Sequence, residues 1–294
     1  MEQLLCIDLD QPGLTGFRKF ISSWLYRSDD ATLLVDPGPL STIPHLVSEL
    51  RRAGIKQLDA ILLTHIHIDH AGGVGELLKS FPSAQVICHP EGVRHMVAPE
   101  KLWQGSLKVL GATAEAYGEI LPVPAEQIGF SEKIGKVQAF KTPGHAQHHL
   151  SYLIGDLLFA GEGAGVRCSV GQGIYMRPAT PPRFVKQVAL DSIDKMLALQ
   201  PKRMVFAHYG MVEDAVEHLK IAQQQLTLWL QGVKEVSELE PAAQEKAFYR
   251  WLLANDRVFA NIKQLEPDLF ERERIFLNNS LRGMLEYIAS TNES

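Results

Sequence analysis

The stretch from Thr64 to His70 constrains this chain more than any other. It reads Thr-His-Ile-His-Ile-Asp-His and places three imidazoles and one carboxylate within six positions: His65, His67, Asp69 and His70. The apolar run of residues 60–63 precedes it, and Gly72-Gly73 follow, as expected of a buried strand that ends in a loop. Imidazole nitrogens and carboxylate oxygens suit divalent zinc, iron or manganese. The stretch therefore predicts a metal site at a strand end, with a histidine-rich surface loop as the alternative.

Three later segments repeat this pattern of an apolar run closed by a potential metal ligand. The ligands and the runs before them are His145 after residues 137–140, Glu162 after residues 157–160, and His208 after residues 204–207. His89 also ends an apolar run, just before Pro90, and so imitates a ligand; we leave it out of the site. The repetition of the pattern favours a metal site over a surface loop, since independent strand ends supply ligands of the same kind.

With these motifs the chain resembles the metallo-β-lactamase fold superfamily, and its layout is most similar to the glyoxalase-II-like branch. The matching motifs run from Asp36-Pro37-Gly38 to His208. The resemblance implies a mixed α/β (α+β) fold, a four-layer αββα sandwich in which two mixed sheets face each other and helices cover the outside. It also implies that the metal ligands lie at one edge, where strand ends meet.

The resemblance further implies which residues hold which ion. One ion would be held by His65, His67 and His145, the second by Asp69, His70 and His208, and Glu162 would bridge the two. We expect two divalent ions, with zinc favoured and iron or manganese as alternatives. A hydroxide that bridges the ions would be the nucleophile, because metal coordination can lower the pKa of water from about 15.7 to about 7. Asp69 and Glu162 are the expected catalytic carboxylates, and Asp69 could pass a proton to the leaving group.

Glu162 departs from the family, which normally has aspartate at the bridging position. Glutamate is longer by one methylene, so either the backbone sits farther from the ions or the second ion is held more weakly. A mononuclear site is the alternative. The flanking Gly161 and Gly163 favour the bridge, since they allow the backbone to retreat.

Six further residues are candidates for orienting ligands or contacting substrate: Asp36, His148, His149, Arg167, Tyr175 and Arg177. Asp36 resembles a residue that lies beneath the metal site in the family, and ordinary turn chemistry is its alternative role. His148 and His149 follow the expected ligand His145, and one of them is expected to orient a ligand or contact substrate; a purely structural role for both is the alternative. The remaining three lie in the glycine-rich segment 163–177, which is expected to be a loop that binds an anionic group.

The composition changes to a helical one after residue 211. We expect a catalytic domain over residues 1–211 and a helical C-terminal extension over residues 212–294. The first expected helix carries a long apolar stripe, which must be buried against the catalytic domain or against a second subunit in a homodimer. Pro241 and Pro267 mark the beginnings of two more helices.

Composition and charge exclude several classes of partner. The 294 residues carry a net charge of −5, and basic residues occur in no run longer than a pair, so we expect no nucleic-acid partner. The sequence has no run of 18 apolar residues, and its first residues have no basic export signal, so we expect no membrane span. Three widely separated cysteines favour a reduced, cytoplasmic compartment. The expected partner is a small-molecule substrate.

Three functions of different class fit these observations. The first is a metal-dependent hydrolase that cleaves an ester-type bond in a thioester, a lactone, another carboxylic ester or a phosphoester. The second is a mononuclear non-haem iron dioxygenase of the persulfide-oxidising kind, which resembles the same branch. The third is a non-catalytic binder, which the full ligand set disfavours. The substrate stays open: lactonases of the superfamily often carry tyrosine three residues after the bridging acid, where this chain has Gly165.

Overall fold

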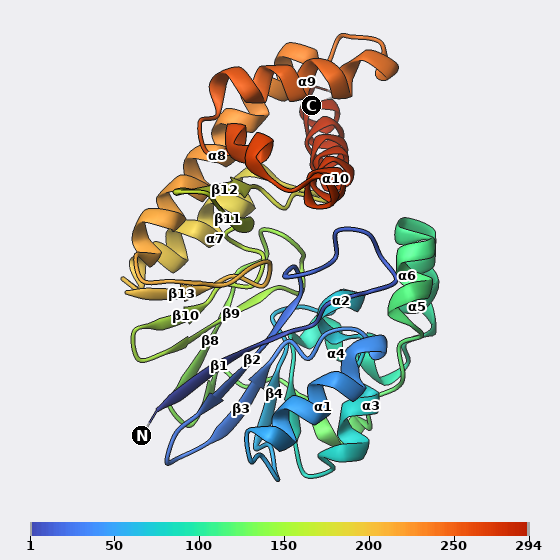
Figure 1. Ribbon diagram of the computed structural model, residues 1–294, viewed down its shortest axis with the longest axis vertical. Coiled ribbons are helices and arrows are strands. Elements are labelled where there is room, and N and C mark those ends of the chain that lie inside the picture. Colours follow the sequence, from blue (N-terminus) through green and yellow to red (C-terminus); the bar gives the residue numbers. More distant parts are fainter. Residues whose placement is uncertain (1, 293–294) are drawn as a thin grey trace. The chain divides into compact units, whose positions relative to one another are not determined.

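The computed structural model describes residues 2–292, which fold as two units (Figure 1). Unit 1 comprises the chain up to Lys141 together with residues 148–155, and unit 2 comprises residues 142–147 and the chain from Asp156 onwards. Within residues 2–292, no helix combines the length and the apolar composition that crossing a bilayer requires.

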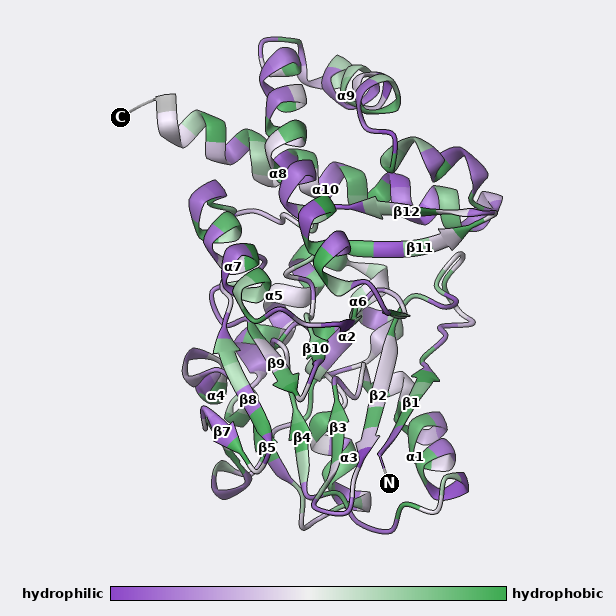
Figure 2. Ribbon diagram, turned by 90° about the vertical axis from the view of Figure 1, so that its left-hand side faces the viewer, coloured by the Kyte–Doolittle hydropathy of each residue, from purple (hydrophilic) through white to green (hydrophobic). Residues whose placement is uncertain are grey.

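Unit 1 is built on a six-stranded sheet in which the strands follow one another in chain order. The strands are β1 (Gln3–Asp8), β2 (Ser22–Arg27), β3 (Thr32–Val35), β4 (Ala60–Leu62), β5 (Gln85–Ile87) and β6 (Ile128–Gly129). The first three pair antiparallel, whereas β3 to β6 are parallel. Parallel strands need crossover connections, and helices supply them here. All of β4 and the last two residues of β5 are apolar and buried, as is typical of parallel strands covered on both faces, and Figure 2 shows the hydrophobic colouring of β4.

The helices of unit 1 lie in the crossovers between these strands. They are η1 (Leu40–Thr42), α1 (Ile43–Arg52), α2 (Ile68–Ala71), α3 (Val74–Ser80), α4 (Pro90–Val97), α5 (Glu100–Leu110), α6 (Ala112–Tyr117) and η2 (Ala125–Gln127). In α1 the apolar residues Ile43, Leu46, Val47 and Leu50 recur at helical spacing and are buried, as the sequence predicts. The ring of His89 accepts a hydrogen bond from the backbone N–H of Glu91 at 3.2 Å, so His89 caps α4.

A second set of strands completes unit 1. It consists of β7 (Lys133–Ile134), β8 (Val137–Lys141) and β9 (Leu150–Ile154), which pair antiparallel. Tyr152 on β9 is fully buried, and its hydroxyl lies 2.8 Å from the carbonyl oxygen of Leu63, just beyond β4. The two sets of strands in unit 1 therefore face each other across a shared core.

Unit 2 contains two groups of strands and the C-terminal helices. β10 (Leu157–Phe159) pairs parallel with β13 (Arg203–Val205), which pairs antiparallel with β14 (Met211–Val212); β11 (Val166–Val170) and β12 (Gly173–Arg177) form a hairpin. The prediction of a loop at 163–177 is therefore wrong, since most of this segment forms the hairpin of β11 and β12. Glycines at its start and at its turn hide the alternation of the strands in the sequence. The helices are α7 (Lys186–Ala198), α8 (Ala215–Val236), α9 (Pro241–Asn255), η3 (Phe259–Gln264) and α10 (Pro267–Asn292).

The apolar stripe predicted for the first C-terminal helix is buried within unit 2. Ala222, Leu226, Trp229 and Val233 all lie on the buried face of α8. This helix packs against α7, α9 and α10. The proposed boundary at residue 211 stays a prediction, and a cut there would divide the edge strand β14, which ends at Val212.

A buried ionic cluster ties the hairpin to α10. The carboxylate of Glu273 on α10 accepts hydrogen bonds from Arg177 Nε at 2.5 Å, Tyr175 Oη at 3.1 Å and Arg272 Nε at 2.9 Å. Burial by itself would raise the pKa of Glu273, but the charges of Arg177 and Arg272 outweigh it and hold the pKa below that of an ordinary glutamate. Glu273 is therefore an anion in the folded protein, and it neutralises the buried Arg177.

We expect Glu273→Gln to destabilise the protein by about 3–5 kcal/mol at pH 7, because it leaves the buried Arg177 without its counter-ion. A carboxylate with a lowered pKa stabilises the fold above its unfolded pKa of about 4.3, and this contribution is lost as the pH falls through the folded pKa. The difference in free energy of unfolding between Glu273→Gln and wild type should therefore become smaller at acidic pH. Urea denaturation at pH 7 and below pH 4 measures both effects. The control is Glu271→Gln, an exposed position on the same helix.

Candidate metal centre

In unit 1 the histidine-rich stretch directly follows the buried strand β4. The ring centroids of His65 and His67 are 4.5 Å apart, and those of His65 and His70 are 4.2 Å apart. His65 and His70 are each 1% exposed, so their imidazoles lie in the protein interior. Asp69 is on the short helix α2 that begins at Ile68, and its Oδ2 is 3.5 Å from Nε2 of His70. The structure thus gathers the four potential ligands of this stretch in one small volume.

Asp36 connects two of these histidines through its buried carboxylate. Its Oδ1 accepts from the backbone N–H of Thr64 at 2.8 Å, and its Oδ2 accepts from the Thr64 hydroxyl at 2.6 Å. The same Oδ2 lies 3.2 Å from Nδ1 of His70. Asp36 has a positive φ of 48°, a conformation that aspartate tolerates better than most residues. Its side chain therefore touches the ligand loop directly, beyond its part in the Asp-Pro-Gly turn.

These contacts decide which ring nitrogens of the ligands carry hydrogen. The Thr64 hydroxyl has one hydrogen, which it donates to Asp36, so it can only accept from Nδ1 of His65 at 3.1 Å. The carboxylate oxygen Oδ2 of Asp36 likewise accepts from Nδ1 of His70. In both rings the Nε2 lone pair is then available as a metal ligand, and a hydrogen bond from the other nitrogen fixes the ring orientation.

His148 and His149 lie beside the same stretch. The ring of His148 is stacked on His65 at 6.3 Å between centroids and stands perpendicular to His67 at 5.6 Å. The fully buried His149 has its ring centroid 5.4 Å from that of His65. Both side chains thus pack around His65, and their role in orienting ligands or contacting substrate stays a prediction.

In unit 2 the carboxylate of Glu162 faces two histidines with its two oxygens. Oε2 lies 3.0 Å from Nε2 of His145, and Oε1 lies 3.7 Å from Nε2 of His208. Glu162 follows β10, His208 follows β13, and these two strands are parallel neighbours, which brings their ends together. All three side chains are at least nine-tenths buried.

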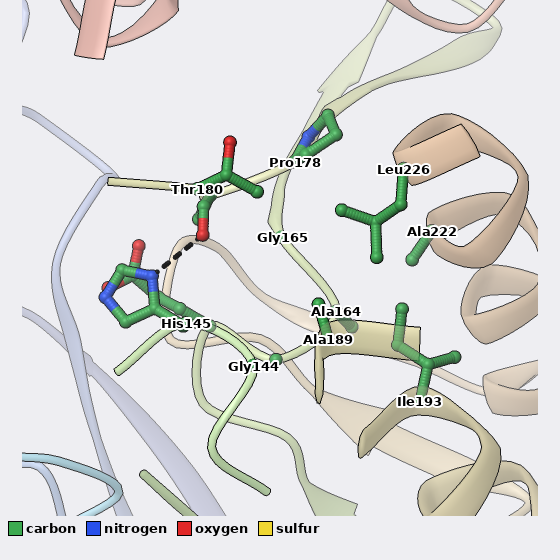
Figure 3. Close-up of a pocket in the computed structure, with 13 residues that line it drawn as sticks. Gly144, His145, Ala164, Gly165, Pro178, Thr180, Ala189, Ile193, Ala222 and Leu226 are labelled. Atoms are coloured by element: carbon green, nitrogen blue, oxygen red, sulfur yellow. Dashed lines mark hydrogen bonds and ion pairs between the residues drawn. The ribbon is translucent and has the colours of Figure 1, made fainter. Parts of the chain in front are cut away.

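A backbone carbonyl fixes the ring of His145. Nδ1 of His145 lies 2.9 Å from the carbonyl oxygen of Ala179, and a carbonyl can only accept, so Nδ1 carries hydrogen (Figure 3). Nε2 therefore turns toward the carboxylate of Glu162. Two acceptors at this distance need a proton or a cation between them. The contact has the form expected of a ligand pair that shares a metal ion.

Helix α10 holds the segment that carries this carbonyl. The Ser280 hydroxyl donates to the carbonyl oxygen of Pro178 at 3.1 Å, and the Thr180 hydroxyl donates to the carbonyl oxygen of Ser280 at 3.4 Å. At Gly283 a side-chain carbon would collide with the carbonyl oxygen of Thr180, so only glycine lets α10 approach this closely. The C-terminal helix therefore determines where the orienting carbonyl of Ala179 lies.

The donor sets of both units fit a divalent metal ion. The potential ligands are the imidazoles of His65, His67, His70, His145 and His208 and the carboxylates of Asp69 and Glu162. No thiolate is among them, which agrees with zinc, iron or manganese in a catalytic site more than with a cysteine-rich structural zinc site.

The three residues expected to bind an anion differ in their surroundings. Tyr175 and Arg177 are buried and hydrogen-bonded to Glu273, so the structure gives both an internal partner. Arg167 donates from Nη1 to Ser169 at 3.1 Å, and its backbone N–H donates to the carbonyl oxygen of His208 at 2.7 Å. Of the three residues, Arg167 therefore stays the candidate for binding an anionic group.

Two positioning groups were not singled out from the sequence. Thr64 directly precedes His65, the first histidine of the stretch, and a hydroxyl group next to a potential ligand is the sequence signal that could have identified it. The carbonyl of Ala179 leaves no such signal, because any residue can supply a backbone oxygen. Its role depends on a contact between segments 34 positions apart.

Comparison with known proteins identifies the family. The sequence model of the Metallo-beta-lactamase superfamily matches residues 16–208. A metallo-beta-lactamase fold-containing protein of Sulfurisphaera tokodaii is 30% identical over 222 residues, which are 71% of this chain and 80% of the relative. This chain belongs to the metallo-beta-lactamase superfamily.

Solved structures confirm the superfamily fold over nearly the whole chain. An archaeal superfamily protein from Sulfolobus tokodaii has a TM-score of 0.70 at 24% identity and covers 96% of this chain and 98% of its own. A metallo-beta-lactamase family protein from Thermus thermophilus has a TM-score of 0.66 at 19% identity, covering 98% of this chain and 94% of its own. The expected αββα superfamily fold with a helical C-terminal region is thus confirmed.

The glyoxalase-II-like likeness is narrower. The hydroxyacylglutathione hydrolase of Aeromonas salmonicida is 32% identical over 139 residues, which are 47% of this chain and 44% of that enzyme. The match therefore spans less than half of the enzyme's length. Together with the superfamily match and the potential ligands, it supports a metallo-hydrolase.

We expect Asp36→Asn to weaken zinc binding about 10–100-fold. The amide has a single accepting oxygen, so its NH2 group must face either the Thr64 N–H or the Thr64 hydroxyl and Nδ1 of His70, and all of these groups donate. Asparagine tolerates positive φ, so the backbone turn should survive. Titration with a competing chelator measures the affinity, and circular dichroism checks the fold. The control is Asp59→Asn, since Asp59 accepts from the backbone N–H of Thr32 and is not among the potential ligands. Wild-type affinity in Asp36→Asn would contradict an orienting role.

Proposed function

We propose that this protein is a metal-dependent hydrolase of ester-type bonds with a dinuclear centre. His65, His67 and His145 would hold one ion, Asp69, His70 and His208 the second, and Glu162 would bridge them. The observation that carries the proposal is the placement of Glu162 in unit 2. Its two oxygens face one histidine of each proposed set, as a bridging carboxylate must.

The chain's own residues would do most of the positioning. Asp36 and Thr64 hold the rings of His65 and His70, and the carbonyl of Ala179 holds that of His145. Divalent ions bound at these residues would supply Lewis-acid activation of water and of the substrate's carbonyl or phosphoryl oxygen. The Asp69 side chain is 17% exposed, so it can accept a proton and deliver it to a leaving group.

The substrate class rests on the relatives and on the chemistry of the site. Hydroxyacylglutathione hydrolase, as named, cleaves an acyl–thiol bond, which supports a thioester or another carboxylic ester. A lactone or a phosphoester uses the same activation of water. Within that group we favour carboxylic esters and thioesters, as the match to this hydrolase suggests. The mononuclear iron dioxygenase stays the alternative.

Metal analysis and a substrate panel test the proposal together. Purified protein should contain close to two zinc-like ions per chain, and metal-loaded protein should hydrolyse at least one substrate among simple thioesters, carboxylic esters, lactones and phosphoesters. One iron per chain, with oxygen consumed on a persulfide and no hydrolysis, would favour the dioxygenase instead. Activity that persists after chelation would contradict both.

We expect Glu162→Gln to remove most of the metal-dependent activity, at least about 100-fold in kcat, because a neutral amide replaces an anion between two cations. The metal content should fall toward one ion per chain, which elemental analysis measures independently of turnover. The control is Glu217→Gln, an exposed carboxylate of the same unit. Two tightly bound ions and normal turnover in Glu162→Gln would show that this residue is not the bridge.

A further inference from the structure

A small cavity within unit 2 lies directly beside His145 and Glu162 (Figure 3). Its empty volume is about 280 Å³, including the part that is open to solvent. Because part of this volume is open to solvent, the enclosed part has room for a small group only. None of the roles proposed for the metal ligands or for the reaction depends on this cavity.

Two helices form its inner wall with apolar side chains. Ala189 and Ile193 come from α7, and Ala222 and Leu226 come from α8. In each pair the residues are four positions apart, so both project from one face of their helix. Figure 3 shows the four side chains converging on the same space. The hollow arises because each helix contributes one alanine where a larger residue would close the gap.

The opposite wall is backbone that the structure holds in place. The segment Pro178–Thr180 lines it, and α10 anchors this segment through Ser280. Gly165 closes the cavity from the turn after β10, with a φ of +81° and its Cα close to the carbonyl of Arg177. A side chain at Gly165 would collide with that carbonyl, so the turn is kept bare. The cavity is thus a formed feature with rigid walls.

The polar and apolar side chains that line the cavity lie on different sides of it: Figure 3 shows His145 on one side and Ile193, Ala222 and Leu226 on the other. Among the residues that line the cavity, His145 and Glu162 are the ones with titratable side chains, and they belong to the proposed metal centre. The Thr180 hydroxyl is engaged with the carbonyl of Ser280. A small group in this cavity would contact the apolar side chains of α7 and α8 on one side and backbone atoms of the Pro178–Thr180 segment on the other.

We propose that this cavity binds a short apolar substituent of the substrate, next to the bond that is cleaved, and thereby sets the chain length that the protein accepts. The proposal rests on the ester hydrolase function proposed above. Burial of each methylene in such a cavity is favourable until the wall is reached, and one methylene too many is then rejected. We take Ala222 and Leu226 as the specificity-determining residues, since both line the cavity from one helix and differ in size.

The experiment measures kcat/KM of the metal-loaded protein on two substrate series. One series varies the acyl group from acetyl to hexanoyl with a constant leaving group. The other varies the leaving alcohol or thiol with a constant acetyl group. A steep dependence on length in one series identifies which side of the bond enters the cavity.

Two variants should move the length profile in opposite directions. Leu226→Ala lengthens the cavity, so the ratio of kcat/KM for the next longer substrate over the shortest should rise about tenfold. Ala222→Leu fills the cavity, so the same ratio should fall about tenfold for a propyl or butyl substituent. The matched control is Leu230→Ala, one turn farther along α8, which is buried but does not line the cavity. It should keep the wild-type length profile.

Length profiles that are the same in wild type, Leu226→Ala and Ala222→Leu would overturn the proposal. If wild type hydrolyses none of the substrates, the hydrolase function is contradicted. A binding measurement then tests the cavity proposal by itself. The melting temperature of metal-loaded protein is then measured with acetate, butyrate and hexanoate. A preference for one length that shifts in opposite directions in the two variants would support the cavity, whereas no preference in any protein would overturn it.

Discussion

Burial of the Asp36 carboxylate is the constraint on which the ligand loop of unit 1 depends. A buried carboxylate is costly unless hydrogen-bond donors surround it. Here the donors are the backbone N–H and hydroxyl of Thr64 and the ring of His70, so the cost is offset only when the loop after β4 takes this one conformation. The same hydrogen bonds thus stabilise the turn after β3 and orient two potential metal ligands.

Unit 2 contains another buried carboxylate, that of Glu273, whose burial would likewise be costly without hydrogen-bond donors. This buried carboxylate accepts from Arg177 at the end of β12 and from Arg272 on its own helix, and so fixes α10 against the hairpin. The chain that leaves β12 then carries the carbonyl of Ala179 to Nδ1 of His145 and forms one wall of the cavity. Removal of α10 would therefore disturb a potential ligand and the proposed substrate cavity together.

The sequence predicted elements well where one local signal dominated. Helix α1 (Ile43–Arg52) has such a signal, because the helical spacing of its apolar residues and the Gly54 that follows leave little choice. The hairpin of β11 and β12 was missed, since its glycines read as a loop and Arg177 read as a residue available to an anion. The partner that occupies Arg177 lies 96 positions later in the chain, and no local pattern predicts such a pairing.

The sequence by itself determined the family, the fold class and the set of candidate ligands, because imidazoles and carboxylates after apolar runs form a chemical signature that is readable along the chain. The tertiary structure decided what surrounds them. It assigned hydrogen to Nδ1 of His65 and His145, placed Glu162 between two histidines, and left a hollow between α7 and α8. These features depend on distances between atoms far apart in sequence, and only packing sets such distances.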